Sequence, residues 1–258
     1  MTVERRSTRM QLADHLVTHR IAGDVATSRK SNLANIDKML AREPEYWFGL
    51  ELGRPWSFDD VLKVLTMRVG IDPDPTRTTG ADRIDPQLCL DALDAAARLI
   101  DDVVRRRGRL LLGTGHPTGT LALLMPIARH LAAAGCEVLS AGDGDWVEVI
   151  GERRRIRYVD GVATVGTGGD LMHTHSPEPM QHALAQLAAP PDLVIGDHGW
   201  AGAAGEAGLP TVGLADTNDP ALFVGAEEGK VAVVVPLDDN VLPAAYGPVA
   251  TYLLAGVD

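Results

Sequence analysis

Histidines and carboxylates gather in the second half of the chain, in combinations that suit metal binding. Six of the eight histidines follow residue 110, and His173 and His175 form a His-x-His pair that would share one face of an extended segment. That spacing equally fits two hydrogen-bonding loop histidines. Imidazole and carboxylate groups together favour Mg, Mn, Zn or Fe/Co, and such a metal can activate water. The predicted ligands of one or two divalent cations are His173, His175, Asp197, Asp216 and Asp219.

A second set of residues could transfer protons at such a site. General acid–base catalysts are most often histidines, followed by Glu and Asp. His116 lies in a glycine-rich loop, and His198 follows a predicted strand directly. We predict His116, His198 and Glu206 as the catalytic residues. A solvent-facing position on a helix is the alternative for Glu206.

The segment GTGHPTG follows a short apolar run and precedes a helical pattern. A helix N-terminus behind such a loop binds phosphate through its backbone amides and the helix dipole. The predicted phosphate-binding residues are Thr114, Gly115, Thr118, Gly119 and Ser176. A dinucleotide is the alternative, since Asp143 ends the next strand at the distance of a ribose-binding acid. It fits less well, because Pro117 removes an amide from the loop.

Asp143, Gly144 and Asp145 follow a predicted strand. Their Asp-x-Asp spacing resembles the nucleophile motif of haloacid-dehalogenase-type phosphatases. Trp146 and Val147 stand where Gly and Thr usually follow in that motif, and the strand is the second of the predicted core. A hairpin turn is therefore the favoured interpretation of these two acids.

The net charge of −11 is distributed unevenly. Residues 1–109 hold 18 basic and 17 acidic side chains, whereas residues 110–258 hold 6 basic and 18 acidic ones. An acidic chain of this kind lacks the basic surface that nucleic-acid binding requires. A phosphorylated substrate would be repelled by the second half unless positive charge were supplied there. The predicted sources are a divalent cation or four basic residues of the first half, Arg20, Arg29, Lys30 and Arg54.

Composition excludes several other classes of protein. Cys89 and Cys136 are too few for a disulfide framework or a thiolate zinc site. No apolar run approaches the ~20 residues that span a bilayer, and the N-terminus is too charged for a signal peptide. We therefore expect a cytoplasmic protein with no membrane and no nucleic-acid partner. Homo-oligomer formation stays open.

The order of predicted elements indicates a two-part chain. Residues 1–108 are predicted to form a mostly helical segment that packs on the core, including a helix capped by Asp85 with Pro86 at its first position. From residue 109 onward, buried strands alternate with helices, interrupted by a polar β-ribbon over residues 146–165. Continuous apolar strands indicate a mostly parallel sheet covered on both faces. The expected fold is a Rossmann-like α/β core over residues 109–258 with an N-terminal helical cap.

Several motifs resemble one known family. They are GTGHPTG, LMHTHSPEPM, GDHGWAG, NDPALF and VPLDDN, together with IAGDVAT and EYWFGLELG near the N-terminus. The chain is similar to an actinobacterial family of soluble proteins generically labelled "phosphatase", and the resemblance implies hydrolysis of a small phosphomonoester. The expectation is a metal-assisted phosphatase of a sugar, polyol or related phosphate. The alternatives are a sugar-phosphate isomerase or lyase, and a non-catalytic module that binds a phosphosugar or nucleotide.

Overall fold

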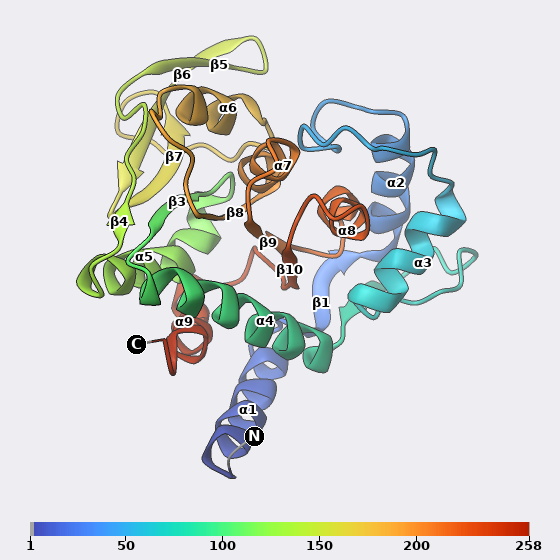
Figure 1. Cartoon of the computed structure of the whole chain (residues 1–258). Coiled ribbons are helices and arrows are strands. Elements are labelled where there is room, and N and C mark those ends of the chain that lie inside the picture. The colour runs from blue at the N-terminus through green and yellow to red at the C-terminus, as the bar shows by residue number, and fades with distance from the viewer. Residues whose placement is uncertain (1–2, 258) are drawn as a thin grey trace.

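One central sheet of mostly parallel strands organises the chain (Figure 1). The computed structural model describes residues 3–257, and their side chains from Thr8 onward. Across the sheet the order is β10 (Val233–Pro236), β9 (Thr211–Ala215), β8 (Leu193–Asp197), β3 (Arg109–Gly113), β7 (Val162–Gly166), β6 (Glu152–Val159) and β5 (Trp146–Val149), with β4 (Glu137–Val138) paired to the start of β3. The expected mixed α/β fold with a mostly parallel sheet is confirmed.

The winding direction of the sheet reverses between β3 and β8. From β3 the chain passes to β4 and β7 on one side, and then crosses to β8, β9 and β10 on the other. Gly113 and Gly196 pair at the carboxyl ends of β3 and β8. Ligand sites of open α/β sheets form at such a reversal, beyond the carboxyl ends of the strands. The next residues along the two strands, Thr114 and Asp197, therefore stand where a site is expected.

Helices cover both faces of the sheet, as the apolar strands predicted. Leu110 and Leu112 of β3 pack in one hydrophobic cluster, whereas Leu111 between them packs in the other. The first cluster includes α4 (Pro86–Arg105), α5 (Pro117–Ala133) and α9 (Gly247–Leu254). The second includes α6 (Glu178–Ala185) and α7 (His198–Glu206), and α8 (Pro220–Glu227) lies beside α7. Burial on two faces explains the uninterrupted apolar sequence of these strands.

Helix α4 forms as its local sequence predicts. The Asp85 side chain accepts a hydrogen bond from the Gln87 amide at 2.7 Å, and Pro86 takes the first helical position. Leu90, Leu93 and other apolar residues at helical spacing are buried along one side. Because α4 packs on β8 and β10, this helix from the first part of the chain belongs to the cover of the sheet.

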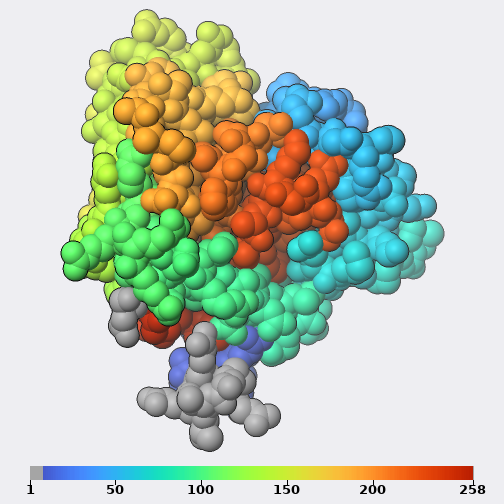
Figure 2. All heavy atoms as spheres, viewed as in Figure 1, coloured from blue at the N-terminus to red at the C-terminus, as the bar shows by residue number. Residues whose placement is uncertain are grey.

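The rest of the N-terminal part is built from α1 (Val3–Thr18), β1 (Gly23–Ser28), α2 (Arg29–Leu40), α3 (Phe58–Arg68) and β2 (Ala81–Ile84). Strands β1 and β2 pair antiparallel, and both α2 and α3 pack on α8. Figure 2 shows the cyan residues of this region lying against the orange-red residues of α8. The amide of Asp238 donates to the Ile21 carbonyl at 2.8 Å, so this part of the chain reaches the carboxyl end of β10.

Strands β5, β6 and β7 form the predicted antiparallel ribbon. Asp143 and Asp145 lie in the turn that precedes it, and Asp145 Oδ2 is 3.0 Å from His182 Nε2. The turn interpretation of Asp143 and Asp145 therefore agrees with the structure. Among residues 3–257, no helix has the length and apolar character needed to cross a membrane.

Candidate functional site

The Asp197 side chain connects the carboxyl ends of β8 and β3, between which the winding direction of the sheet reverses. Its Oδ1 accepts a hydrogen bond from the Gly115 amide at 2.6 Å, and its Oδ2 accepts from the hydroxyls of Thr114 at 2.6 Å and Thr120 at 3.0 Å. Asp197 is fully buried. Since both oxygens are engaged by the loop after β3, the geometry suits Asp197 as the group that positions this loop.

The glycine-rich loop uses its amides internally. The Gly115 amide donates to Asp197, the His116 amide to the Thr114 hydroxyl, and the Gly119 amide to the His116 carbonyl. A Cβ on Gly115 would lie 2.0 Å from the Thr174 carbonyl oxygen. The loop thus gains close packing from its glycines, and it holds His116 in place.

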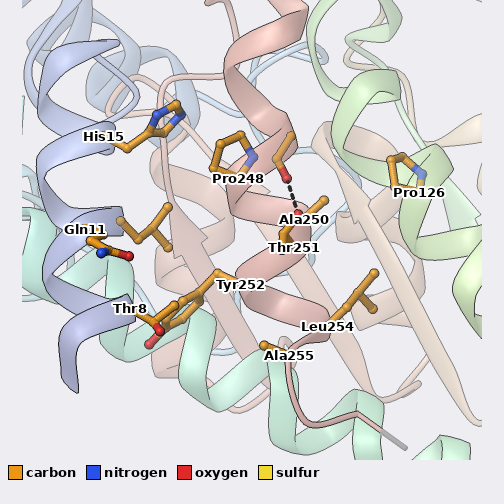
Figure 3. A pocket seen from close by; sticks show the side chains of 12 residues that line it. Thr8, Gln11, His15, Pro126, Pro248, Ala250, Thr251, Tyr252, Leu254 and Ala255 are labelled. Carbon is orange, nitrogen blue, oxygen red and sulfur yellow. Dashed lines mark hydrogen bonds between the residues drawn. The ribbon is translucent and has the colours of Figure 1, made fainter. Parts of the chain in front are cut away.

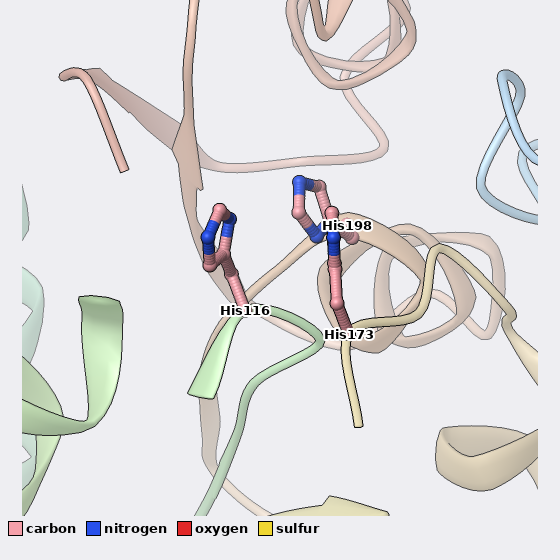
Figure 4. Close-up of side chains that lie close together, drawn as sticks. All are labelled: His116, His173 and His198. Carbon is pink, nitrogen blue, oxygen red and sulfur yellow. The ribbon is translucent and has the colours of Figure 1, made fainter. Parts of the chain in front are cut away.

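Three histidines from different loops converge at this edge of the sheet (Figure 4). His116 follows β3, His173 follows β7, and His198 begins α7. The ring centroids of His116 and His173 are 4.5 Å apart in a stacked arrangement, and those of His173 and His198 are 5.4 Å apart. One nitrogen of each ring lies within 4.8 Å of one nitrogen of each other ring. A single cation could therefore contact all three.

Two carboxylates complete this group. His198 Nε2 lies 3.2 Å from Asp239 Oδ2 and 3.5 Å from Asp219 Oδ2, and His116 Nδ1 lies 3.2 Å from the same oxygen of Asp239. Among the described residues, His116 Nδ1, His198 Nδ1 and Asp239 Oδ2 are buried without a well-aligned hydrogen bond. Buried polar atoms of native proteins are normally paired, so such atoms point to a ligand.

His175 stands next to His173 in a fixed orientation. Its Nδ1 lies 2.7 Å from the Glu45 carbonyl oxygen, and because a carbonyl can only accept, Nδ1 carries the proton. The lone pair of Nε2 then faces His173 Nε2, 3.1 Å away. Metal-binding histidines are commonly oriented in this way by a carbonyl on the other nitrogen. We name His116, His173, His175, His198, Asp219 and Asp239 the histidine–aspartate cluster.

The charges within the cluster set its protonation. Burial, followed by the charge of His198, lowers the pKa of both His173 and His175 to about 4, so both are neutral at pH 7. Burial alone would lower the pKa of His198, but Asp219 and Asp239 raise it well above the ordinary value. Burial alone would raise the pKa of Asp239, yet the neighbouring imidazoles of His116 and His198, each 3.2 Å from its Oδ2, lower it. Protonated imidazole therefore balances the Asp239 charge in the chain alone.

The backbone at His198 is strained. Its φ of 41° lies in the left-handed region, which residues with side chains rarely adopt. The neighbouring Gly199 fits so closely that a Cβ there would lie 2.2 Å from the Ser176 carbonyl oxygen. Strain of this kind is maintained by the surrounding structure and concentrates at functional positions.

Two further carboxylates meet Asp239 of the cluster. Asp216, Asp238 and Asp239 each place one oxygen within 4.8 Å of the others, and all three are buried. We name them the acidic triplet. Residues of β1 border it, since the Thr27 hydroxyl donates to Asp216 and the Ala26 amide donates to Asp238 at 3.2 Å. Burial, followed by the charges of its two acidic neighbours, raises the pKa of Asp216 well above the ordinary value.

Other predicted site residues lie apart from this convergence. Glu206 ends α7, where its carboxylate is 2.6 Å from Lys230 Nζ and accepts the Glu51 amide at 2.8 Å. Thr118 is exposed in the first turn of α5. Ser176 does not cap α6, because its hydroxyl donates to Glu178. None of these three side chains belongs to the histidine–aspartate cluster or the acidic triplet.

Three of the four basic residues considered as phosphate partners have other contacts, and the fourth, Lys30, is exposed on the surface. Arg29 is fully buried, where it pairs with Asp82 at 2.9 Å and donates to the carbonyls of Asp74 and Arg77. Arg54 stacks over Trp56. Arg20 donates to the backbone carbonyls of residues 24 and 25, and Lys30 is exposed on α2.

Some residues of the site have only a weak local sequence signal, or none. Asp238 and Asp239 end a predicted strand, but their sequence does not distinguish them from helix-capping acids. Phe48 packs against His175 and His198, with ring centroids 5.3 and 5.4 Å away. Its place in the site depends on the fold, because it comes from the N-terminal part of the chain.

A groove of about 760 Å³ lies elsewhere, between α1, α5 and α9 (Figure 3). Its lining is mostly apolar, including Leu12, Pro126 and Leu254. His15 is its histidine, and Nε2 of this residue is 2.7 Å from the Ala245 carbonyl oxygen. The groove shares no lining residue with the histidine–aspartate cluster or the acidic triplet. We therefore place the candidate site at the sheet edge.

Comparison with known proteins agrees with the motifs. The sequence profile of a family described as "Phosphatase" matches residues 7–258. The chain is also 42% identical over 260 residues to "Phosphatase SCO2771" of Streptomyces coelicolor, and 98% of each chain is covered. Both matches span the sheet, the histidine–aspartate cluster and the acidic triplet, and the expected resemblance to an actinobacterial family is confirmed. The chain therefore belongs to the phosphatase family.

Proposed function

We propose that this protein hydrolyses small phosphomonoesters with the help of a divalent cation held by the histidine–aspartate cluster. The observation that supports this proposal most strongly is a convergence of three histidines and two carboxylates, His116, His173, His198, Asp219 and Asp239. Buried nitrogen and oxygen atoms of this group lack aligned hydrogen bonds. Mixed imidazole and carboxylate donors suit Zn, Mn or Fe/Co.

Electrostatics supports the need for a cation. A phosphomonoester carries negative charge, and the carboxylates of Asp216, Asp219, Asp238 and Asp239 surround the proposed binding place. The three arginines considered as phosphate partners, Arg20, Arg29 and Arg54, have other contacts. A bound divalent cation would neutralise the phosphate oxygens and lower the pKa of a water molecule.

The residues of the cluster divide into two proposed roles. His173 and His198, with Asp219 and Asp239, hold the cation, and His175 supports His173 from the side. His116 is the acid–base residue, because Asp239 faces its Nδ1 and leaves Nε2 to transfer a proton. In the reaction, water adds to phosphorus as the ester P–O bond breaks, His116 gives its proton to the leaving alcohol oxygen, and one proton of the added water returns to His116.

The depth of the site supports a small substrate with a terminal phosphate. The exposed fractions of His198 and Asp219 are both 2%. Phe48 forms a wall beside His175 and His198. His173 is exposed, so a phosphate at the end of a small molecule can approach the cluster from that side. Membership of the phosphatase family favours hydrolysis over sugar-phosphate isomerisation and over binding without turnover.

A substrate panel tests the proposal. Metal-stripped protein is reloaded with Mg²⁺, Mn²⁺ or Zn²⁺, and phosphate release is measured with sugar phosphates, polyol phosphates and a phosphodiester. We expect release from monoesters with at least one cation, and its loss in His198→Ala. His19→Ala is the matched control, since His19 is exposed and outside the site. No release from any monoester under any cation would refute the proposal.

A further inference from the structure

The acidic triplet contains more buried carboxylates than the first cation would contact. Asp216, Asp238 and Asp239 are exposed by 3%, 1% and 5%, and their ligand oxygens lie within 4.8 Å of one another. Among the described ion pairs, none joins Lys or Arg to these three carboxylates, and Arg20 acts on Asp238 only at longer range. Buried charges in proteins are normally paired or coordinate metal.

The contacts of Asp216 and Asp238 hold their carboxylate oxygens in place without supplying positive charge. Asp216 accepts hydrogen bonds from the Thr27 hydroxyl and the Thr217 amide, and Asp238 accepts from the amides of Ala26 and Asn240. These donors are uncharged. A carboxylate oxygen has two acceptor directions, so each can accept such a bond and still face a cation.

Asp239 provides the observation that points to a ligand shared by both groups. It belongs both to the acidic triplet and to the group formed by His198 and Asp219. Its Oδ2 is buried without a well-aligned hydrogen bond among the described residues. One carboxylate shared between two adjacent groups is the arrangement by which paired metal sites are joined.

We propose that the site holds two cations, the second one bound by Asp216, Asp238 and Asp239, with Asp239 bridging to the first. The inference rests on the proposed function for the identity of the first cation position. The two positions differ in chemistry, because one is rich in imidazole and the other offers carboxylate oxygens alone. The second position therefore suits a hard cation, Mg²⁺ or Mn²⁺.

Residues of the N-terminal part take part in this second position. Thr27 and Ala26 of β1 orient Asp216 and Asp238, so the docking of residues 20–28 is required to complete it. Loss of these contacts would leave the first position intact, because none of its residues contacts β1 in this way.

Manganese stoichiometry tests the inference directly. EDTA-stripped protein is dialysed against saturating Mn²⁺, and bound manganese per chain is measured by mass spectrometry. We expect two ions for the wild type, one for Asp238→Asn, one for His173→Ala, and two for the exposed control Asp37→Asn. One ion in the wild type, or two in Asp238→Asn, would overturn it.

Electron paramagnetic resonance of the same samples tests the bridge. Two Mn²⁺ ions joined by Asp239 give a spin-coupled spectrum, and Asp238→Asn should give the six-line spectrum of an isolated ion. Uncoupled spectra in a wild type holding two ions would contradict the shared carboxylate. The melting temperatures in EDTA of Asp238→Asn and a second variant, Asp216→Asn, verify folding, and the second variant should also hold one ion.

The outcomes separate this inference from the proposed function. Two bound ions without phosphate release from any monoester would leave the inference standing and refute the proposed function. Full phosphate release by a protein that binds one ion would refute the inference and leave the proposed function standing.

Discussion

His198 Nε2 lies 3.2 Å from Asp239 Oδ2, although the two residues follow different strands of the sheet. His198 begins the helix after β8, and Asp239 follows β10. Asp219, from the loop after β9, approaches the same nitrogen at 3.5 Å. The segments that follow three consecutive parallel strands thus bring one imidazole and two carboxylates together in the buried site.

Replacement of Asp197 by Asn should destabilise the fold, because Asn offers one acceptor oxygen to three donors. The amide of Gly115 and the hydroxyls of Thr114 and Thr120 would compete for it. We expect a loss of about 3 kcal/mol in the free energy of unfolding, measured by urea denaturation in EDTA. Asp37→Asn, on an exposed carboxylate, is the control. Unchanged metal-free stability combined with lost metal binding would instead make Asp197 a ligand.

Gly119 is required for packing, and a methyl group there should be costly. A Cβ would lie 2.0 Å from the carbonyl oxygen of Asp239, so Gly119→Ala must displace the backbone that carries this carboxylate. We expect a loss of about 1–3 kcal/mol in stability, together with reduced cation affinity. Gly247→Ala is the matched control, since Gly247 has helical dihedral angles and nothing within 4 Å of a Cβ. Equal melting temperatures for the two variants would contradict this account.

Glu206→Gln should leave phosphate release unchanged. The carboxylate of Glu206 contacts Lys230 and the Glu51 amide at the far end of α7. Partly exposed ion pairs contribute about 0–1 kcal/mol, so the melting temperature should fall only slightly. Steady-state kinetics with the preferred monoester provides the measurement. A decrease of kcat by a factor of about 100 would restore Glu206 as an acid–base residue.

His116→Asn should separate proton transfer from cation binding. Asn cannot donate a proton to the leaving group, and we expect kcat to fall by a factor of about 10²–10⁴. Bound cation per chain should stay near the wild-type value, because His173, His198, Asp219 and Asp239 remain. His19→Asn is the control. Loss of the cation together with activity would show that His116 is a ligand.

Local signals predicted much of the fold. The Asp85–Pro86 pair specifies its helix start through contacts within four residues, and the alternation of residues 146–165 specifies the antiparallel ribbon. The apolar strands predicted a sheet buried on both faces, because consecutive residues such as Leu110 and Leu111 point to opposite faces and both are apolar. The two side chains pack in different hydrophobic clusters.

The site was predicted less completely, because its contacts join distant parts of the chain. The His-x-His pair and several acids that follow predicted strands lie at the sheet edge where the histidine–aspartate cluster forms. The sequence did not reveal that Asp197 oxygens face amides and hydroxyls, whereas Asp219 and Asp239 face His198. Gly119 resembled part of a phosphate loop, yet its neighbour is the Asp239 backbone, 120 residues later.

The most direct test of the central claim measures cation content and phosphate release in the same samples. EDTA-stripped protein is titrated with Mn²⁺, and both quantities are followed for the wild type and for His198→Ala. We predict no release from the stripped wild type, and release that rises with bound Mn²⁺. His198→Ala should bind less Mn²⁺ and release no phosphate. Undiminished phosphate release from the stripped wild type would contradict the claim that a cation in the histidine–aspartate cluster drives the reaction.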